Sequence, residues 1–183
     1  MSKVYVFLAD GFEEIEALTV VDLLRRAKVY VDTVSITDDY TVRGAHGIPV
    51  QTEDLITEID FKESDMIVLP GGMPGTTNLK EDENVRKAVQ EAYDDGRYVA
   101  AICAAPTILA DMGILKGKRA TCYPDMESEI EDAYLTGAPV ATDENIITSQ
   151  GVGTAIDFAL KLIEVLISEE KAVEIADSIV YQR

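Results

Sequence analysis

Short apolar runs that alternate with helix-like segments constrain the fold of this chain more than any other feature. The runs at residues 4–8, 29–36, 66–69 and 98–102 have the length and the apolar character of buried strands. Residues 13–26 carry apolar side chains at steps of three to four, which predicts a helix, and residues 83–94 are also predicted to be helical. This alternation indicates an α/β fold made of parallel β-α-β units, with helices on both faces of the sheet.

The rest of the chain continues the pattern. Helices are predicted at residues 104–112, 127–133, 153–167 and 169–175, and strands at 119–122, 139–141 and 146–148, with two small strand-like pieces near 41–42 and 50–51. A length of 183 residues without a linker, repeat or low-complexity segment favours one doubly wound domain over residues 1–183.

Composition excludes several classes of partner and cofactor. The net charge of −18 would repel nucleic acid and anionic membranes, so neither is expected as a partner. No run reaches the roughly 18 apolar residues of a membrane span. The N-terminus also lacks a signal-peptide pattern, so a cytoplasmic location is expected. The two cysteines form no CxxC or Cys/His cluster, so we expect no metal site and two free thiols.

Four turns are the candidate functional regions. In doubly wound sheets the ligand site lies beyond the carboxyl ends of the strands. That rule selects the turns after Leu8, Leu69, Ile102 and Thr148, whose sequences are DGFEEIE (10–16), PGG (70–72), CAAP (103–106) and SQGVG (149–153). The predicted fold therefore brings a thiol, several carboxylates and several glycines to one edge of the sheet.

Cys103 is the central candidate among these residues. It ends a predicted strand and begins a predicted helix, as the serine of a nucleophile elbow does. A helix N-terminus favours the thiolate, and small Ala104 and Ala105 let backbone pack closely around the sulfur. A buried structural cysteine fits the same position, because free cysteines are often buried.

The other three turns offer groups that a reactive thiol would use. Gly71 and Gly72 permit a turn that exposes backbone N–H groups toward an oxyanion, although an ordinary strand-ending turn has the same sequence. Glu16 lies among apolar residues and could meet Cys103 as a proton-carrying carboxyl, or it could be a solvated carboxylate. Glu13 and Glu14 fit the ordinary preference for acids in a first helical turn.

Gly151 and Gly153 resemble only half of a phosphate-binding loop, because position 156 is Ile. We expect instead that these glycines let their own backbone approach the Cys103 turn closely.

Together, the motifs GFEEIE (11–16), VLPGG (68–72), AAICAAP (100–106) and TSQGVGT (148–154) resemble the ThiJ/PfpI superfamily and, within it, the DJ-one group. The resemblance covers nearly the whole chain, with the motifs in the family's order. It implies a flavodoxin-like three-layer sandwich with a mostly parallel sheet, a homodimer and no cofactor.

The resemblance also implies roles for individual residues. Cys103 would be the oxidisable nucleophile on a strained elbow, with Glu16 as the carboxyl that contacts its sulfur. The amides of Gly72 and Ala104 would form an anion pocket, with Gly71 next to Gly72 in the same turn. Two more positions match family positions: Arg26 would lie near that pocket, and His46 stands where relatives carry an arginine that reaches the partner subunit's site. An exposed loop histidine is the alternative for His46.

Two departures from the family pattern narrow the chemistry. Ala104 stands where the protease-like branch has a histidine, which excludes a Cys-His protease dyad. Tyr123 stands where members with glyoxalase-type activity place a histidine, and a phenol with a pKa near 10 is a poor base at neutral pH. Glu16 would then carry the proton transfers alone. Cys122, next to Tyr123, is either a resolving thiol for Cys103 or an independent cysteine.

Three functions are consistent with these residues. The first is a cysteine-dependent enzyme, of deglycase or glyoxalase type, that acts on small α-oxoaldehydes or on glycated protein groups. The second is a non-enzymatic oxidative-stress sensor in which Cys103 oxidises to a sulfinate. The third is a chaperone, which would need a large exposed apolar patch.

Overall fold

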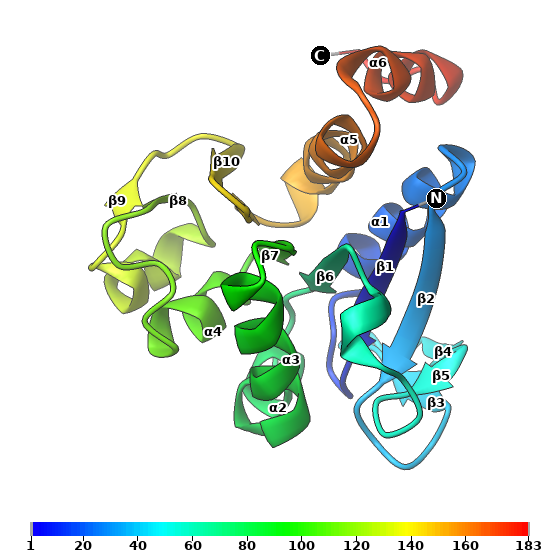
Figure 1. Ribbon diagram of the computed structural model, residues 1–183, viewed down its shortest axis with the longest axis vertical. Helices are drawn as coiled ribbons and strands as arrows, with labels where there is room; N and C mark the ends of the chain where they lie inside the picture. The colour runs from blue at the N-terminus through cyan, green and yellow to red at the C-terminus, as the bar shows by residue number, and fades with distance from the viewer. Residues whose placement is uncertain (1, 183) are drawn as a thin grey trace.

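The computed structural model describes residues 2–182, and its centre is a seven-stranded sheet in the order β10-β11-β7-β6-β1-β2-β5 (Figure 1). Every neighbouring pair is parallel except β10 and β11, which form an antiparallel hairpin at one edge. The strands are β1 (Lys3–Leu8), β2 (Tyr30–Ser35), β5 (Asp54–Leu55), β6 (Met66–Leu69), β7 (Tyr98–Ile102), β10 (Val140–Asp143) and β11 (Ile146–Ser149). The sheet confirms the predicted α/β class.

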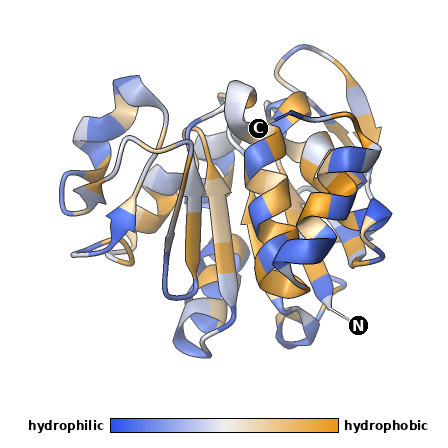
Figure 2. Cartoon of the chain, turned by 90° about the horizontal axis from the view of Figure 1, so that it is seen from above, coloured by the Kyte–Doolittle hydropathy of each residue, from blue (hydrophilic) through white to orange (hydrophobic). Residues whose placement is uncertain are grey.

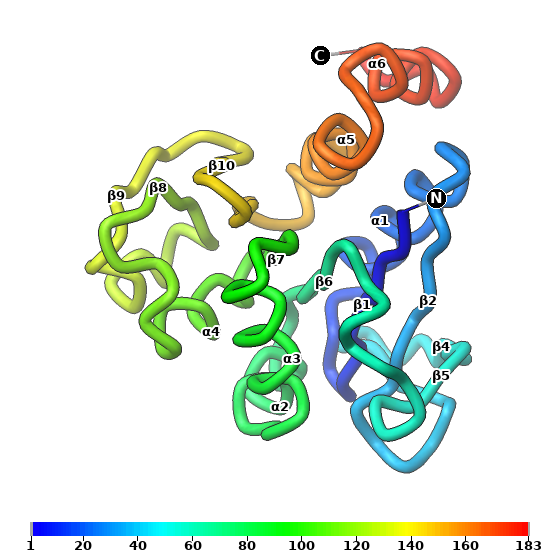
Figure 3. The backbone as a smooth tube through the Cα atoms, viewed as in Figure 1, coloured from blue at the N-terminus to red at the C-terminus, as the bar shows by residue number. Residues whose placement is uncertain are grey.

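Helices cover both faces of this sheet, which makes three layers. The helices α1 (Glu14–Arg26), α5 (Ala155–Leu166) and α6 (Glu169–Ser178) pack on one face, and α2 (Gly75–Glu81), α3 (Glu83–Asp94) and α4 (Pro106–Asp111) on the other. The tube in Figure 3 shows N-terminal α1 next to C-terminal α5.

The residues of β1 show why the core has two halves. Val4, Val6 and Leu8 belong to the apolar cluster under α1 and α5, whereas Tyr5 and Phe7 belong to the cluster under α2, α3 and α4. Successive side chains of a strand point to opposite faces, so a strand buried on both sides reads as a continuous apolar run. Figure 2 shows hydrophobic residues along the central strands, and blue and orange residues that alternate along the helices.

Smaller elements lie outside the main sheet. The strands β3 (Thr41–Arg43) and β4 (Pro49–Gln51) form a hairpin, as the two strand-like pieces predicted. The pair β8 (Arg119–Ala120) and β9 (Tyr134–Leu135) is parallel, and short 3₁₀ helices span Phe61–Glu63 (η1), Pro124–Ile130 (η2) and Val152–Thr154 (η3). None of the described helices is long and apolar enough to cross a membrane.

The largest errors in the predicted elements concern the turns at the site. The helix predicted at 104–112 begins only at Pro106, because Cys103 and the two alanines after it form a turn. The helix predicted at 127–133 is the 3₁₀ helix η2. The strand predicted at 119–122 is only the two-residue strand β8, which lies outside the seven-stranded sheet. Helix α2 was not predicted, since its sequence GTTNLKE has no apolar repeat.

Candidate active site

The cysteine elbow lies where β7 ends, at the carboxyl edge of the sheet. Cys103 is half-buried and has φ of +64°, a left-handed conformation that costs energy for a residue with a Cβ. Two backbone hydrogen bonds hold this conformation: Cys103 N donates to Ser149 O at 3.0 Å, and Tyr123 N donates to Cys103 O at 2.8 Å. The neighbouring strand ends therefore support the strained elbow predicted from the sequence.

Glu16 comes to the elbow from the first turn of α1 and is fully buried. Its Oε2 accepts a hydrogen bond from Gly71 N at 2.9 Å, while its Oε1 has no partner with hydrogen-bond geometry in the described chain. A Cβ added to Gly151 would lie 3.9 Å from both Glu16 Oε1 and Cys103 Sγ. The unpartnered carboxyl oxygen and the sulfur thus face the same glycine.

The ionisation of the two groups is linked. Burial raises the pKa of Glu16 to about 7, against the opposing effects of the Cys103 thiol and the Gly71 N–H. Burial and the Glu16 charge together raise the pKa of Cys103 to about 12, although the amides of Ala104 and Gly72 favour its thiolate. Because each negative charge disfavours the other, the pair holds at most one negative charge near neutral pH.

The expectation that a helix N-terminus lowers the pKa of the thiol was therefore wrong. Helix α4 begins three residues after Cys103, and burial outweighs the two amides that stabilise the thiolate. The thiol becomes a thiolate in this setting when the proton resides on Glu16 instead.

The glycine turn after β6 has two separate uses. The amide of Gly72, which has φ of +91°, favours the Cys103 thiolate together with the amide of Ala104. Gly71 was expected in the same anion pocket, but its N–H is bound to Glu16 and its carbonyl accepts from Glu13 N at 2.9 Å. A Cβ on Gly71 would lie 2.7 Å from both Cys103 Cβ and Glu16 Oε2, so only glycine lets the three residues meet.

A pocket of about 460 Å³ opens in front of Cys103 and Glu16. Tyr123, Gly151 and Gly153, which were predicted as secondary site residues, all line it, and the Tyr123 side chain is exposed. The full lining comprises Glu13, Glu16, Gly72, Cys103, Tyr123, Pro124, Gln150, Gly151, Val152, Gly153 and Thr154. The topology rule therefore selected the correct four turns.

Two predicted residues are not at this pocket. Arg26 is ten residues beyond Glu16, about 15 Å along α1, and is ion-paired with Asp22 at 2.7 Å. The expectation that Arg26 lies near the anion pocket was wrong. His46 is exposed on the loop between β3 and β4, and its Nδ1 lies 2.8 Å from Glu14 Oε2. That His46 reaches the partner subunit's site stays a prediction.

Cys122 was considered as a resolving thiol, and the structure places it elsewhere. It is fully buried in the core under α2, α3 and α4, whereas Cys103 packs against the core under α1 and α5. Cys122 Sγ donates to Tyr123 O at 3.3 Å, and burial raises the pKa of its thiol to about 11. The two sulfurs belong to opposite faces of the sheet.

Sequence reasoning missed the roles of Glu13 and Glu14. Glu14 is buried, and its Oε1 accepts from His46 N at 2.8 Å and Ile48 N at 3.4 Å, which ties the loop to α1. Glu13 caps α1 and lines the Cys103 pocket. Acidic residues in a first helical turn look alike in a sequence, so no signal distinguished these two from an ordinary helix start.

These two carboxylates and His46 are also the one group in residues 2–182 whose potential ligand atoms are close enough for a metal ion. The Glu14 oxygens already have hydrogen-bond partners without a metal ion, because they bind the His46 ring and two backbone amides.

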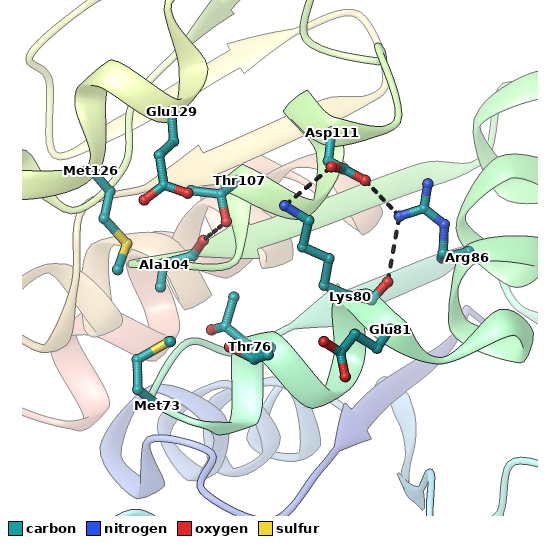
Figure 4. A pocket seen from close by; sticks show the side chains of 11 residues that line it. Met73, Thr76, Lys80, Glu81, Arg86, Ala104, Thr107, Asp111, Met126 and Glu129 are labelled. Atoms are coloured by element: carbon teal, nitrogen blue, oxygen red, sulfur yellow. Dashed lines mark hydrogen bonds and ion pairs between the residues drawn. The ribbon is translucent and has the colours of Figure 1, made fainter.

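A second pocket, of about 490 Å³, lies on the other side of Ala104 (Figure 4). Asp111 bridges Lys80 at 3.1 Å and Arg86 at 2.7 Å on one side of it, and Met73 and Met126 lie on the other. Neither Cys103 nor Glu16 lines this pocket, so the cavity with the titratable pair is the candidate active site.

Comparisons with known proteins place the chain in a family. The DJ-1/PfpI family model matches residues 2–165. The chain is 36% identical to "Protein dj-1beta" of Drosophila melanogaster over 96% of both chains, and 34% identical to "Glutathione-independent glyoxalase DJ-1" of Schizosaccharomyces pombe over 93% and 94%. It is 39% identical to "Protein DJ-1 homolog B" of Arabidopsis thaliana, of which it spans 41%.

Solved structures give the same result. A cysteine-to-alanine mutant of a DJ-1 superfamily protein from Salmonella typhimurium superposes with a TM-score of 0.95 at 34% identity, over the full length of both chains. Drosophila DJ-1beta also superposes with a TM-score of 0.95 at 34% identity over both full chains. These matches confirm the flavodoxin-like fold and the resemblance seen in the four motifs, and the chain belongs to the DJ-1/PfpI family.

Proposed function

We propose that this chain is a cofactor-independent, cysteine-dependent enzyme of carbonyl stress that converts α-oxoaldehydes such as methylglyoxal to hydroxy acids. The observation that carries the proposal is the buried carboxyl of Glu16, whose unpartnered oxygen and the Cys103 sulfur face the same glycine. A pKa of about 7 allows this carboxyl both to give and to take a proton at neutral pH. The name of the fission yeast relative supports a glyoxalase-type reaction.

The first step forms a covalent adduct. The proton of the thiol moves to Glu16, and the sulfur electron pair attacks the aldehyde carbon of the substrate. The aldehyde oxygen takes that proton back from Glu16, which gives a hemithioacetal and leaves Glu16 as a carboxylate. The amides of Gly72 and Ala104 point toward the sulfur and stabilise the charge that develops there.

The second step moves a proton between two carbons. The Glu16 carboxylate removes the proton of the thiol-bearing carbon, the electron pair forms an enediol, and the neighbouring carbon is reprotonated to give a thioester. Water then hydrolyses the thioester, which releases the hydroxy acid and restores the thiol. The balance is one aldehyde and one water in and one hydroxy acid out, with no external oxidant or reductant. The same thiolate would attack aldehyde-derived adducts on proteins.

The test is an assay of lactate formed from methylglyoxal. We expect Cys103→Ala and Glu16→Gln to lose about a hundredfold or more of the wild-type kcat, because one removes the nucleophile and the other the proton carrier. Cys122→Ala is the matched control for removing a thiol, and we expect it to stay within a few-fold of wild type. Equal rates in all four proteins would contradict the proposal.

A second candidate function is redox sensing by the same sulfur. Cys103 is half-buried at the pocket, and the amides that favour its thiolate would also bind a sulfinate oxygen. Two equivalents of hydrogen peroxide would deliver two oxygens and leave as water. Intact-mass spectra under graded peroxide should show this mass gain at Cys103 before Cys122 reacts, and simultaneous oxidation of both would contradict it.

We also propose that two copies of the chain pair through the outer face of α1. Ile15 is 53% exposed and Ile48 is 52% exposed, and both line a mainly apolar hollow with Leu18. Analytical ultracentrifugation of the wild type and of Ile15→Glu measures whether each protein is a dimer or a monomer. A shift from dimer to monomer in the variant is expected, and a monomeric wild type would contradict the proposal.

A further inference from the structure

The titratable groups that line the pocket in front of Cys103 are all acids. They are Glu13, Glu16, Cys103 and Tyr123, and no Lys, Arg or His of residues 2–182 lines the pocket. Glu16 and Cys103 together carry at most one negative charge near neutral pH. Glu13 contributes a further negative charge from the pocket wall.

Several contacts fix the position of Glu13. Its backbone N–H donates to Gly71 O at 2.9 Å, and its Oε1 accepts from Ile15 N at 3.4 Å as the cap of α1. The backbone also packs tightly on the next glycine, since a Cβ on Gly72 would lie 2.4 Å from Glu13 N. The side chain is only 13% exposed, so solvent screens its charge less than that of a surface carboxylate.

His46 offsets only part of the Glu13 charge, because one basic ring is shared between two carboxylates. The only basic ring near it, His46, has its Nδ1 3.5 Å from Glu13 Oε2 but 2.8 Å from Glu14 Oε2, so its close partner is Glu14. Glu14 does not line the Cys103 pocket, whereas Glu13 does. The charge of Glu13 also reaches Glu16, whose pKa it helps to raise.

We propose that Glu13 is a specificity-determining residue that makes the Cys103 pocket select uncharged or cationic carbonyl compounds and reject carboxylate-bearing ones. The same charge repels the hydroxy-acid product, which is an anion, and so assists its release. The substrate side of this inference rests on the proposed function. The selection by charge, which we call the charge filter, requires only that a small electrophile reaches Cys103.

The test uses two probes of nearly equal size that differ in charge, iodoacetamide and iodoacetate. The second-order rate constant for alkylation of Cys103 is measured with each probe at one pH by peptide mass spectrometry. The ratio of iodoacetate to iodoacetamide is then divided by the same ratio for a small uncharged thiol. We expect this normalised ratio to be about tenfold or more below one in the wild type, given an effective dielectric constant of about 20 at such sites.

The critical variant is Glu13→Gln, which removes the charge but keeps an oxygen that accepts the Ile15 N–H. It should raise the normalised ratio about tenfold. Glu13→Asp keeps the charge and should keep the ratio low. Glu174→Gln removes the same charge from an exposed site on α6 and should leave the ratio as in wild type. An unchanged ratio in Glu13→Gln, or an equal rise in Glu174→Gln, would overturn the inference.

These outcomes are separate from those of the lactate assay. A low wild-type ratio that Glu13→Gln relieves establishes the filter even in a protein that makes no lactate. Lactate formation combined with a wild-type ratio near one supports the enzyme and refutes the filter.

Discussion

Cys103 and Cys122 stand at neighbouring turns and are linked by a residue between them, since Tyr123 N donates to Cys103 O and Tyr123 O accepts from Cys122 Sγ. Their surroundings differ in every other respect. Cys103 has a left-handed backbone, an adjacent carboxyl and a pocket in front of it, whereas Cys122 is fully enclosed in the opposite core.

The comparison shows that pKa alone does not decide which thiol reacts. Burial raises the pKa of both thiols, to about 12 for Cys103 and about 11 for Cys122, so neither thiol is appreciably ionised at neutral pH. Access to the pocket and an adjacent carboxyl that takes the proton are available to Cys103 alone, and we expect these two features to decide which thiol reacts.

The largest expected effect is therefore the difference in modification rate between the two thiols. Iodoacetamide should alkylate Cys103 about a thousandfold or more faster than Cys122, because reaction at Cys122 requires the fully buried core to open. Peptide mass spectrometry of the folded protein measures both rates. In urea the two rates should converge. A native Cys122 that reacts within tenfold of Cys103 would contradict the comparison.

The fold and the gathering of the four site turns were predictable from the sequence, whereas the contact between Cys103 and Glu16 was expected only from the family resemblance. Continuous apolar runs such as residues 66–69 identify strands buried on both faces, and the strand-end rule then gathers four distant turns. That Glu16 points inward while Glu13 caps the helix was not predictable from composition. It depends on the start of α1 at Glu14, which is set by packing against the Gly71 turn.

The expected position of Arg26 and the resolving-thiol alternative for Cys122 were wrong for a shared physical reason. Position along the chain says nothing about which side of a helix or a sheet a side chain takes, and both residues are directed away from the pocket. The dihedral angles of the Cys103 turn, which delay α4 to Pro106, are fixed by hydrogen bonds to other strand ends and have no local sequence signal.

The second prediction concerns the stability cost of Glu16, a cost that has no counterpart at Cys122. The pKa of Glu16 in the folded protein is about 7, above the ordinary value of 4.5. The contribution of Glu16 to the free energy of unfolding is therefore full below about pH 4.5 and is lost as pH rises through 7. Glu16→Gln removes this loss and should gain about 3 kcal/mol relative to wild type between pH 4.5 and pH 8. Urea unfolding at both pH values measures it, and a pH-independent difference would contradict it.

The third prediction tests the close packing at the elbow. Gly71→Ala should destabilise the protein by about 2–3 kcal/mol, because its Cβ would lie 2.7 Å from Cys103 Cβ and from Glu16 Oε2. Gly47→Ala is the control, since a Cβ there meets no atom within 4 Å and only its φ of +80° is strained. It should cost about 1 kcal/mol. Thermal unfolding with equal losses in both variants would refute the packing argument.

The smallest effect is expected at Gly151. A Cβ there has ordinary contacts, 3.7 Å from the Tyr123 ring and 3.9 Å from Cys103 Sγ, so Gly151→Ala should leave the melting temperature nearly unchanged. The added methyl group covers the sulfur and should slow the alkylation of Cys103 by about threefold to tenfold, equivalent to about 1 kcal/mol, with no change at Cys122. A large loss of stability would show that the backbone of Gly151 is not free to carry a side chain.

The most direct test of the central claim, that Cys103 and Glu16 share one proton, is the pH dependence of Cys103 alkylation in the wild type and in Glu16→Gln. The wild-type rate should rise up to about pH 7 and then level off. Once the pair has lost one proton, the fraction that carries the thiolate with a protonated Glu16 no longer changes with pH, and the form in which both groups are ionised appears only toward pH 12. The Glu16→Gln rate should continue to rise above pH 7, about tenfold per pH unit, until its own thiol ionises. Two profiles that rise in parallel above pH 7 would show that the thiol ionises independently of Glu16 and would contradict the account.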